Sequence, residues 1–453
     1  MTGFIIECNG IFSFFSYAIS HINHINHINH INHKKFPQVT ACMQLEMSCF
    51  LNQSTLLLVK TCRLLLEDKW PCEETVTFDG SRFSDELSDQ ASLIFFDAVL
   101  RHGKARSLSV KRTRLSLKSD RIFKQILTSV SSLQKLELCN IECDGGLSPS
   151  YSFLDVNASH LQDLKIEKCK ISSKTASVLA TLIELGTLQS LKLTQIDLRS
   201  TRFFHALARD GCSLDSLELR EAGMDQSALS ALFQSLASNQ TLKSIRLEGC
   251  AVGSNQACEL AQLLSTHPRL RSLSLCNNDL DGKDVKVIAE NGLRKNTTLR
   301  KLELSHNPIC DSGAEELSRL LCHNSSIESL SLVDCEIWST GFIALARRLA
   351  KMKGLKQLVI NDEICDHANI VLQSLKSNFI LTQILTDRTP LEVKDDCQWK
   401  QVDFYLMLNR SKRRILIEPG VPFSLWPLVL SDQDASTRYH FLRDKPELTA
   451  GLA

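Results

Sequence analysis

One apolar pattern recurs along most of this chain and constrains its fold more than any other feature. The stretch LRKLELSHNPI places Leu299, Leu302, Leu304, Asn307 and Ile309 at positions 1, 4, 6, 9 and 11. Other copies of this spacing begin at Leu133, Leu161, Leu188, Leu214, Leu242, Leu270, Ile327 and Leu355. The first residues of consecutive copies lie 26 to 29 residues apart. Such a chain is predicted to fold as a stack of similar units, not around a single compact core.

Each copy combines two kinds of periodicity. Around positions 4 to 6, apolar and polar residues alternate, which is typical of a short strand. The residues that follow are spaced as in a helix, and in 311–324 the apolar ones are Ala314, Leu317, Leu320 and Leu321. A strand and a helix in every unit predict a curved α/β solenoid, with parallel strands on the concave face and helices on the convex face.

The spacing and the period resemble the leucine-rich repeats of the ribonuclease-inhibitor type. With weaker copies that begin at Glu73, Ala105 and Leu381, the resemblance covers roughly residues 73–391. It implies an inward-facing Asn or Cys at position 9, as in Asn278, Asn307, Cys169, Cys250 and Cys335. This side chain is expected to bond the backbone of the turn, strongly for Asn and weakly for Cys. This series of inward-facing Asn and Cys side chains is predicted to be interrupted at three copies, whose position 9 residues are Ile141, Ile196 and Ala222.

The repeats are flanked by segments of different composition. Residues 1–33 contain the tract HINHINHINHINH, a low-complexity sequence that we expect to be disordered rather than to bind a metal. Residues 34–72 and 392–453 are predicted to form an N-terminal and a C-terminal helical cap, because an uncapped repeat array exposes its apolar end. The tail, with LNR, LWPLVL and FLR, resembles the C-terminal segment of leucine-rich repeat proteins of unicellular algae.

The composition argues against several classes of function. The 52 basic and 51 acidic residues give a formal net charge of +1, so no general attraction to nucleic acids or anionic membranes is expected. The 17 cysteines are odd in number and include no Cys-x-x-Cys pair, which indicates reduced thiols in a cytoplasmic protein. A nuclear location is the alternative, because a nuclear-import signal could be formed by the basic residues Arg410, Lys412, Arg413 and Arg414. No nucleotide-binding loop or catalytic motif is present in the sequence, and we expect neither an enzyme nor a cofactor or metal site.

The strand residue between the two apolar positions is expected to face the concave side, because side chains alternate along a strand. These residues and those just after each strand carry mixed charges and no aromatic rings, which favours a protein partner over nucleic acid. The alternative is that they are ordinary solvated side chains. The predicted contact residues are Glu137, Lys165, Lys168, Lys192, Glu218, Arg220, Arg246, Glu248, Glu303, His306 and Asp334.

Two of these residues carry a more specific expectation. Lys165 and Lys192 occupy position 5 of adjacent copies, so their ammonium groups are expected to stand side by side and repel each other. Glu218 in the following copy offers only partial relief. A partner carboxylate is predicted to relieve the remaining repulsion.

Two functions fit this sequence. The first is a non-catalytic scaffold that binds a protein partner on the concave face. The second is the regulation of a small GTPase, because the Ran-type GTPase-activating proteins share this repeat class. Those activators carry a strongly acidic tail, whereas residues 392–453 mix both signs of charge. The sequence therefore favours the scaffold.

Overall fold

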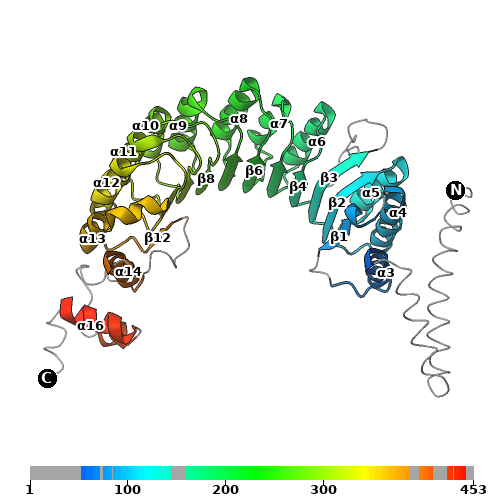
Figure 1. Cartoon of the computed structure of the whole chain (residues 1–453). Coiled ribbons are helices and arrows are strands. Elements are labelled where there is room, and N and C mark those ends of the chain that lie inside the picture. Colours follow the sequence, from blue (N-terminus) through cyan, green and yellow to red (C-terminus); the bar gives the residue numbers. More distant parts are fainter. Residues whose placement is uncertain are drawn as a thin grey trace, which may run out of the picture.

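The computed structural model describes residues 53–71, 75–83, 85–143, 160–386, 397–411, 426–431 and 433–444. The predicted disordered segment 1–33, the beginning of the predicted N-terminal cap and the basic residues 412–414 lie outside these ranges. In the described part, the chain forms an arc with strands along its inner side and helices along its outer side (Figure 1). This is the predicted α/β solenoid with a horseshoe shape.

The strands form one sheet in which every neighbouring pair is parallel and the spatial order equals the chain order. Among the described residues they are β1 (Val76–Asp79), β2 (Ser107–Leu115), β3 (Lys135–Cys143), β4 (Asp163–Glu167), β5 (Ser190–Thr194), β6 (Ser216–Arg220), β7 (Ser244–Glu248), β8 (Ser272–Ser274), β9 (Lys301–Glu303), β10 (Ser329–Leu332), β11 (Gln357–Ile360) and β12 (Gln383–Leu385).

Helices cover the outer side of this sheet (Figure 1). They are α4 (Asp85–His102), α5 (Leu117–Ser129), α6 (Ser173–Glu184), α7 (Thr201–Leu207), α8 (Gln226–Ser238), α9 (Ala257–Thr266), α10 (Gly282–Ile288), α11 (Cys310–Leu321), α12 (Ser339–Arg348) and α13 (Ala368–Ser377). Short turns of other helix types accompany several of them, such as the segment Ala289–Leu293 after α10.

The core lies between the sheet and the helices. The residues at positions 4 and 6 are buried in every copy from β2 to β11, as the alternation predicts. The strand register stacks equivalent residues: Leu302 pairs with Leu273 on one side and with Leu330 on the other. Each unit therefore buries its apolar residues against its neighbours, which is why a single unit has no core of its own.

The position 9 side chains form the predicted inward ladder. Asn307 Nδ2 donates to the carbonyls of Leu275 and Leu304 at 2.9 and 2.8 Å, and its Oδ1 accepts the Leu280 N–H at 3.1 Å. Asn278 bonds its own turn and the previous one in the same way. Cys335 Sγ donates to the carbonyl of Leu304 at 3.3 Å, so a thiol satisfies fewer groups at this position than an amide does.

A second ladder, absent from the sequence-based interpretation, crosses the connections between helices and strands. Its asparagines precede the first residue of the next copy by three positions, as Asn296 precedes Leu299. The Asn296 amide donates to the Leu264 carbonyl at 2.7 Å, while its Oδ1 accepts the N–H groups of Thr298 and Leu299. The same arrangement recurs at Asn239, Asn324 and Asn378. The pattern Asn-x-x-Leu or Asn-x-x-Ile in the sequence would have revealed it.

His267 takes the place of an asparagine in this second ladder. Its Nδ1 accepts the N–H groups of Arg269 and Leu270 at 3.3 and 3.1 Å. Its Nε2 is buried without a hydrogen-bond partner, where an asparagine amide would donate to a carbonyl. Burial lowers the pKa of His267 to about 4, because a charged imidazolium would lack water there.

Helices stand at both ends of the repeat array. At the N-terminal end, α3 (Gln53–Leu66) packs against α4, and His102 Nδ1 lies 3.0 Å from the Leu65 carbonyl. At the C-terminal end, α14 (Cys397–Arg410) packs against α13, and α15 (Trp426–Ser431) and α16 (Ala435–Asp444) follow. Asn409 of α14 donates to the carbonyls of Asn378 and Leu381, which extends the second ladder past the last strand. The exact boundaries of the two caps remain predictions.

Replacing His267 by Asn should stabilise the protein. The amide can restore the donor bond that the buried Nε2 lacks, so we expect the free energy of unfolding at pH 7.5 to rise by about 1–2 kcal/mol. Because the pKa of His267 is about 4 in the folded state and 6.5 for an ordinary histidine, the parent loses stability as pH falls from 6.5 toward 4. The variant should lack this loss, so its advantage should grow at pH 5.

Urea denaturation at the two pH values measures the effect. The exposed His323, which lies two copies further along the chain, provides the control, since His323→Asn changes no side chain of the second ladder. An equal stability of parent and His267→Asn at both pH values would contradict the assignment of His267 to the ladder.

Candidate functional site

The register of the sheet fixes which charged residues meet on the concave face. Position 5 residues pair in order across the strands, from Glu137 to Lys165, then Lys192, Glu218 and Arg246. Neighbouring strands lie about 5 Å apart, so these side chains are within reach of each other. The candidate site is therefore a continuous surface over the sheet, not a pocket.

Glu137 is the centre of a first group of ion pairs. Its Oε1 accepts a hydrogen bond from Lys165 Nζ at 2.8 Å, and its Oε2 accepts one from the Ser109 hydroxyl at 2.8 Å. Lys111 Nζ lies 3.2 Å from the same Oε2. Burial alone would raise the pKa of Glu137, but the hydrogen bonds from Lys165, Ser109 and Lys111 outweigh burial and lower it to about 2.

Lys165 lies between two carboxylates. Besides Glu137, its Nζ contacts Glu167 Oε2 at 3.0 Å, and the hydrogen bond to Glu137 is the main reason that the pKa of Lys165 is raised. The register does place Lys165 beside Lys192, as predicted, but Lys192 Nζ contacts Glu218 at 3.4 Å. The expected unrelieved repulsion is thus wrong, because carboxylates on the opposite sides of the two lysines neutralise them.

A second group of ion pairs continues from Glu218. Arg220 Nη2 donates to Glu248 Oε1 at 2.7 Å, and Arg220 Nε lies 3.9 Å from Glu218 Oε1. Arg246 then connects Glu248 to Glu303, at 3.8 and 3.5 Å. The hydrogen bond to Glu248 is the largest cause of the raised pKa of Arg220. The charges therefore alternate in sign from Lys192 on β5 to Arg246 on β7, and Arg246 reaches across Ser274 of β8 to Glu303 of β9.

The residue at position 8 has a left-handed backbone conformation. In the nine copies from Arg112 to Asp334, its φ lies between 48° and 62°. Arg112 and Asn140 lie inside β2 and β3, whereas from β4 to β10 the position 8 residue follows the strand and belongs to a rim of loops at the strand ends. Three predicted contact residues, Lys168, His306 and Asp334, lie on this rim, and His306 Nδ1 is 3.4 Å from Asp334 Oδ2. Contact of these three with a partner on the concave face stays a prediction.

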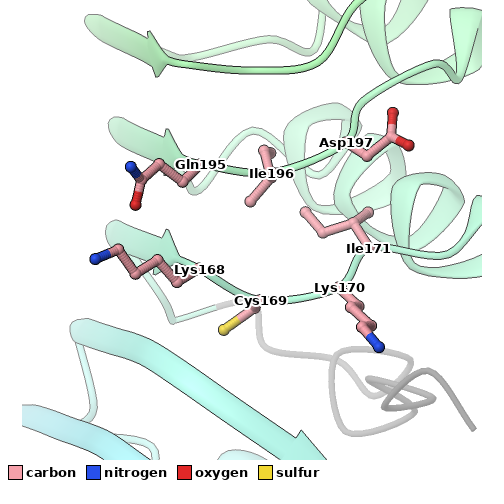
Figure 2. A pocket seen from close by; sticks show the side chains of 7 residues that line it. All are labelled: Lys168, Cys169, Lys170, Ile171, Gln195, Ile196 and Asp197. Carbon is pink, nitrogen blue, oxygen red and sulfur yellow. The ribbon is translucent and has the colours of Figure 1, made fainter. Parts of the chain in front are cut away.

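A shallow hollow of about 480 Å³ lies on the same rim, between the loops after β4 and β5. Figure 2 shows its lining residues, Lys168, Cys169, Lys170, Ile171, Gln195, Ile196 and Asp197. The thiol and the carboxylate in this lining both have partners. Cys169 Sγ donates to the Glu167 carbonyl, and Asp197 forms an ion pair with Arg199. This hollow offers no arrangement of nucleophile and base.

The ladder thiols are poor nucleophiles. Burial is the largest cause that raises the pKa of Cys250 to about 11 and that of Cys335 to about 12, so both are protonated at neutral pH. Within the described ranges, no His, Cys, Asp and Glu side chains gather into a group that could hold a metal ion. The helices described by the structure include none with the length and apolar character needed to span a bilayer.

Changing Glu137 to Gln should alter how stability depends on pH. The parent carboxylate has a pKa of about 2 in the folded state, against 4.5 for an ordinary glutamate, so its contribution to stability is complete above pH 4.5 and is lost as pH falls toward 2. The destabilisation caused by Glu137→Gln should therefore be larger at pH 6 than at pH 3. Denaturant unfolding measures it, with the exposed Glu184→Gln as control; an equal destabilisation at both pH values would refute the role of Glu137.

Comparison with known proteins extends these observations. A family model described as "Leucine Rich repeat" matches residues 295–318. Ribonuclease inhibitor of Mus musculus is 23% identical over 337 residues, which cover 60% of this chain and 74% of that protein. Rho GTPase-activating protein gacW of Dictyostelium discoideum is 25% identical over 282 residues, covering 57% of this chain and 24% of that protein.

Among solved structures, the complex of Rad7 and Elc1 from yeast has a chain that aligns with a TM-score of 0.42 and 16% identity, covering 82% of this chain and 92% of that chain. The matched repeat model, the similarity to ribonuclease inhibitor and the parallel strand–helix units agree with one another. The chain is a leucine-rich repeat protein of the ribonuclease-inhibitor type.

Proposed function

We propose that this protein is a non-catalytic scaffold that binds a protein partner on its concave face. The observation that carries the proposal is the row of position 5 side chains from Glu137 to Glu303, which the parallel strands hold in register and which are all charged except Ser274. Its groups are already oriented by their mutual ion pairs, so a partner loses little side-chain freedom by ordering them. The similarity to ribonuclease inhibitor, a protein named for its action on another protein, supports the proposal.

The ion pairs also determine what kind of partner fits. A charged partner must compete with pairs such as Arg220–Glu248 and Lys192–Glu218 for their hydrogen bonds. A partner with charges in the wrong order would leave carboxylates facing carboxylates, which disfavours binding by several kcal/mol (about 2–5). The alternation of signs thus favours a partner whose own charges alternate with the same spacing.

Regulation of a small GTPase is the second candidate. The similarity to the Rho GTPase-activating protein gacW favours it, although the chain spans about a quarter of that protein. A GTP-hydrolysis assay with purified Ran and Rho proteins separates the two proposals. Under the scaffold proposal the chain leaves both hydrolysis rates unchanged, and an accelerated rate would support the second candidate.

Replacing Lys192 and Arg246 together by Ala should weaken partner binding and preserve the fold. Both side chains are partly exposed and lie on the strand surface, so their loss removes charge without opening the core. Once a partner has been identified by affinity purification, its association rate should fall by about tenfold at low salt, and the difference should shrink as salt rises. Surface plasmon resonance measures both rates.

The double change Lys286→Ala and Arg347→Ala on the outer helices removes the same charge from exposed positions and serves as the control. Melting temperatures of all variants report on the fold. If the outer-helix variant weakens binding as much as the concave one does, the concave face is not the binding surface.

A further inference from the structure

Trp338 is an exposed tryptophan at a position that the other copies fill with small or polar residues. It is 67% exposed and stands at position 12, directly before α12. In three other copies this position holds a helix-capping residue: the side chains of Ser172, Asp225 and Asp281 accept N–H groups in the first turns of α6, α8 and α10. Trp338 makes no such bond. Neither capping nor burial explains this side chain.

The backbone beneath Trp338 is held tightly in place. Its N–H donates to Asp311 Oδ1 at 2.7 Å, and its neighbour Ile337 is buried. A Cβ on Gly341 would lie 2.6 Å from Ile337 Cγ2 and 2.7 Å from Asp311 Oδ1, so the first turn of α12 is packed closely against the previous copy. The indole is therefore exposed to solvent while its backbone is held in place by close packing, which is what an anchor residue of an interface requires.

Carboxylates are frequent in the segments that follow the strands of this copy and its neighbours. The loops and first helical turns after β8, β9, β10 and β11 carry Asp279, Asp281, Asp311, Asp334, Glu336, Glu363 and Asp366, all exposed or half-exposed. The same segments contain one lysine, Lys283, in the first turn of α10. Asp334 pairs with His306, and its Oδ1 accepts the amide of Asn361. Unlike the concave face, these described segments contain more carboxylates than lysines and arginines.

We propose that the Trp338 surface, meaning Trp338 with the carboxylates of these four loops, docks a lysine- or arginine-rich polypeptide segment. A cation over the indole face gains a cation–π interaction, and its neighbours meet carboxylates along the rim. The carboxylates are spread over four repeats and form no metal-holding group within the described residues, which suits an extended partner better than a single ion. Nucleic acids and anionic membranes would be repelled.

A binding experiment with a defined probe tests this proposal. Fluorescein-labelled octa-arginine is titrated with the purified full chain, and anisotropy reports binding. We expect Trp338→Ala to weaken the affinity by about fivefold or more, and Trp338→Phe to retain most of it. Glu336→Gln combined with Glu363→Gln should weaken binding at low salt and reduce its salt dependence. The side chain of Trp338 is mostly exposed, so these variants should fold normally.

Matched controls separate this surface from general attraction to a basic peptide. Tyr439→Ala removes another exposed aromatic ring, and Glu184→Gln with Asp210→Asn removes two exposed carboxylates elsewhere; none should change the affinity. Equal weakening by these controls, or equally tight binding of octa-glutamate, would overturn the proposal. So would a sedimentation change from dimer to monomer in Trp338→Ala, which would assign the surface to a second copy of the chain. The Lys192 and Arg246 variant tests the concave face independently of this result.

Discussion

The buried backbone of the turns is the constraint on which this solenoid depends. Each copy turns twice, once after its strand and once after its helix, and both turns bury N–H and C=O groups that need partners. Two ladders of side chains meet this need, with Asn278 and Asn307 in one and Asn296, Asn324 and Asn378 in the other. Each amide bonds its own turn and the neighbouring unit. The ladders therefore set the spacing between copies as well as the shape of each turn.

That spacing has a consequence for the charges on the concave face. Because equivalent residues of adjacent strands lie about 5 Å apart, a position 5 residue such as Lys192 has charged neighbours in both adjacent copies. Lys165 and Lys192 avoid each other since Glu137 and Glu218 are available on their outer sides. The charges of this face therefore neutralise one another, and under the proposed scaffold function a partner would be selected by the order of the charges more than by a net attraction.

The sequence predicts the parts of this structure that follow from periodicity. The alternation around Leu302 and Leu304 was sufficient to predict the strands, and the helical spacing after it was sufficient to predict the helices. The regular recurrence of position 9 predicted the inward ladder. It was insufficient for the left-handed residue at position 8, because Arg112, Asn140 and Glu221 adopt that conformation without a glycine to indicate it. The periodicity also could not predict which carboxylate each cation pairs with, because Lys165 has carboxylates within reach both in its own copy and in the preceding one. The second ladder had a visible signal in the Asn residues before each copy.

The two candidate surfaces differ in what a partner must displace. On the concave face, a cation from the partner gains a carboxylate only by competing with Arg220, Arg246 or Lys192, so the net gain in free energy is small unless the whole pattern matches. On the rim, no lysine or arginine among the described residues forms an ion pair with Glu336 or Asp334, and the exposed Trp338 follows them in the chain. If both proposals hold, the first surface would select among partners, whereas the second would contribute affinity to many. A partner long enough to reach from β6 to the loop after β10 would combine selection with affinity, because binding at one surface raises the effective concentration at the other.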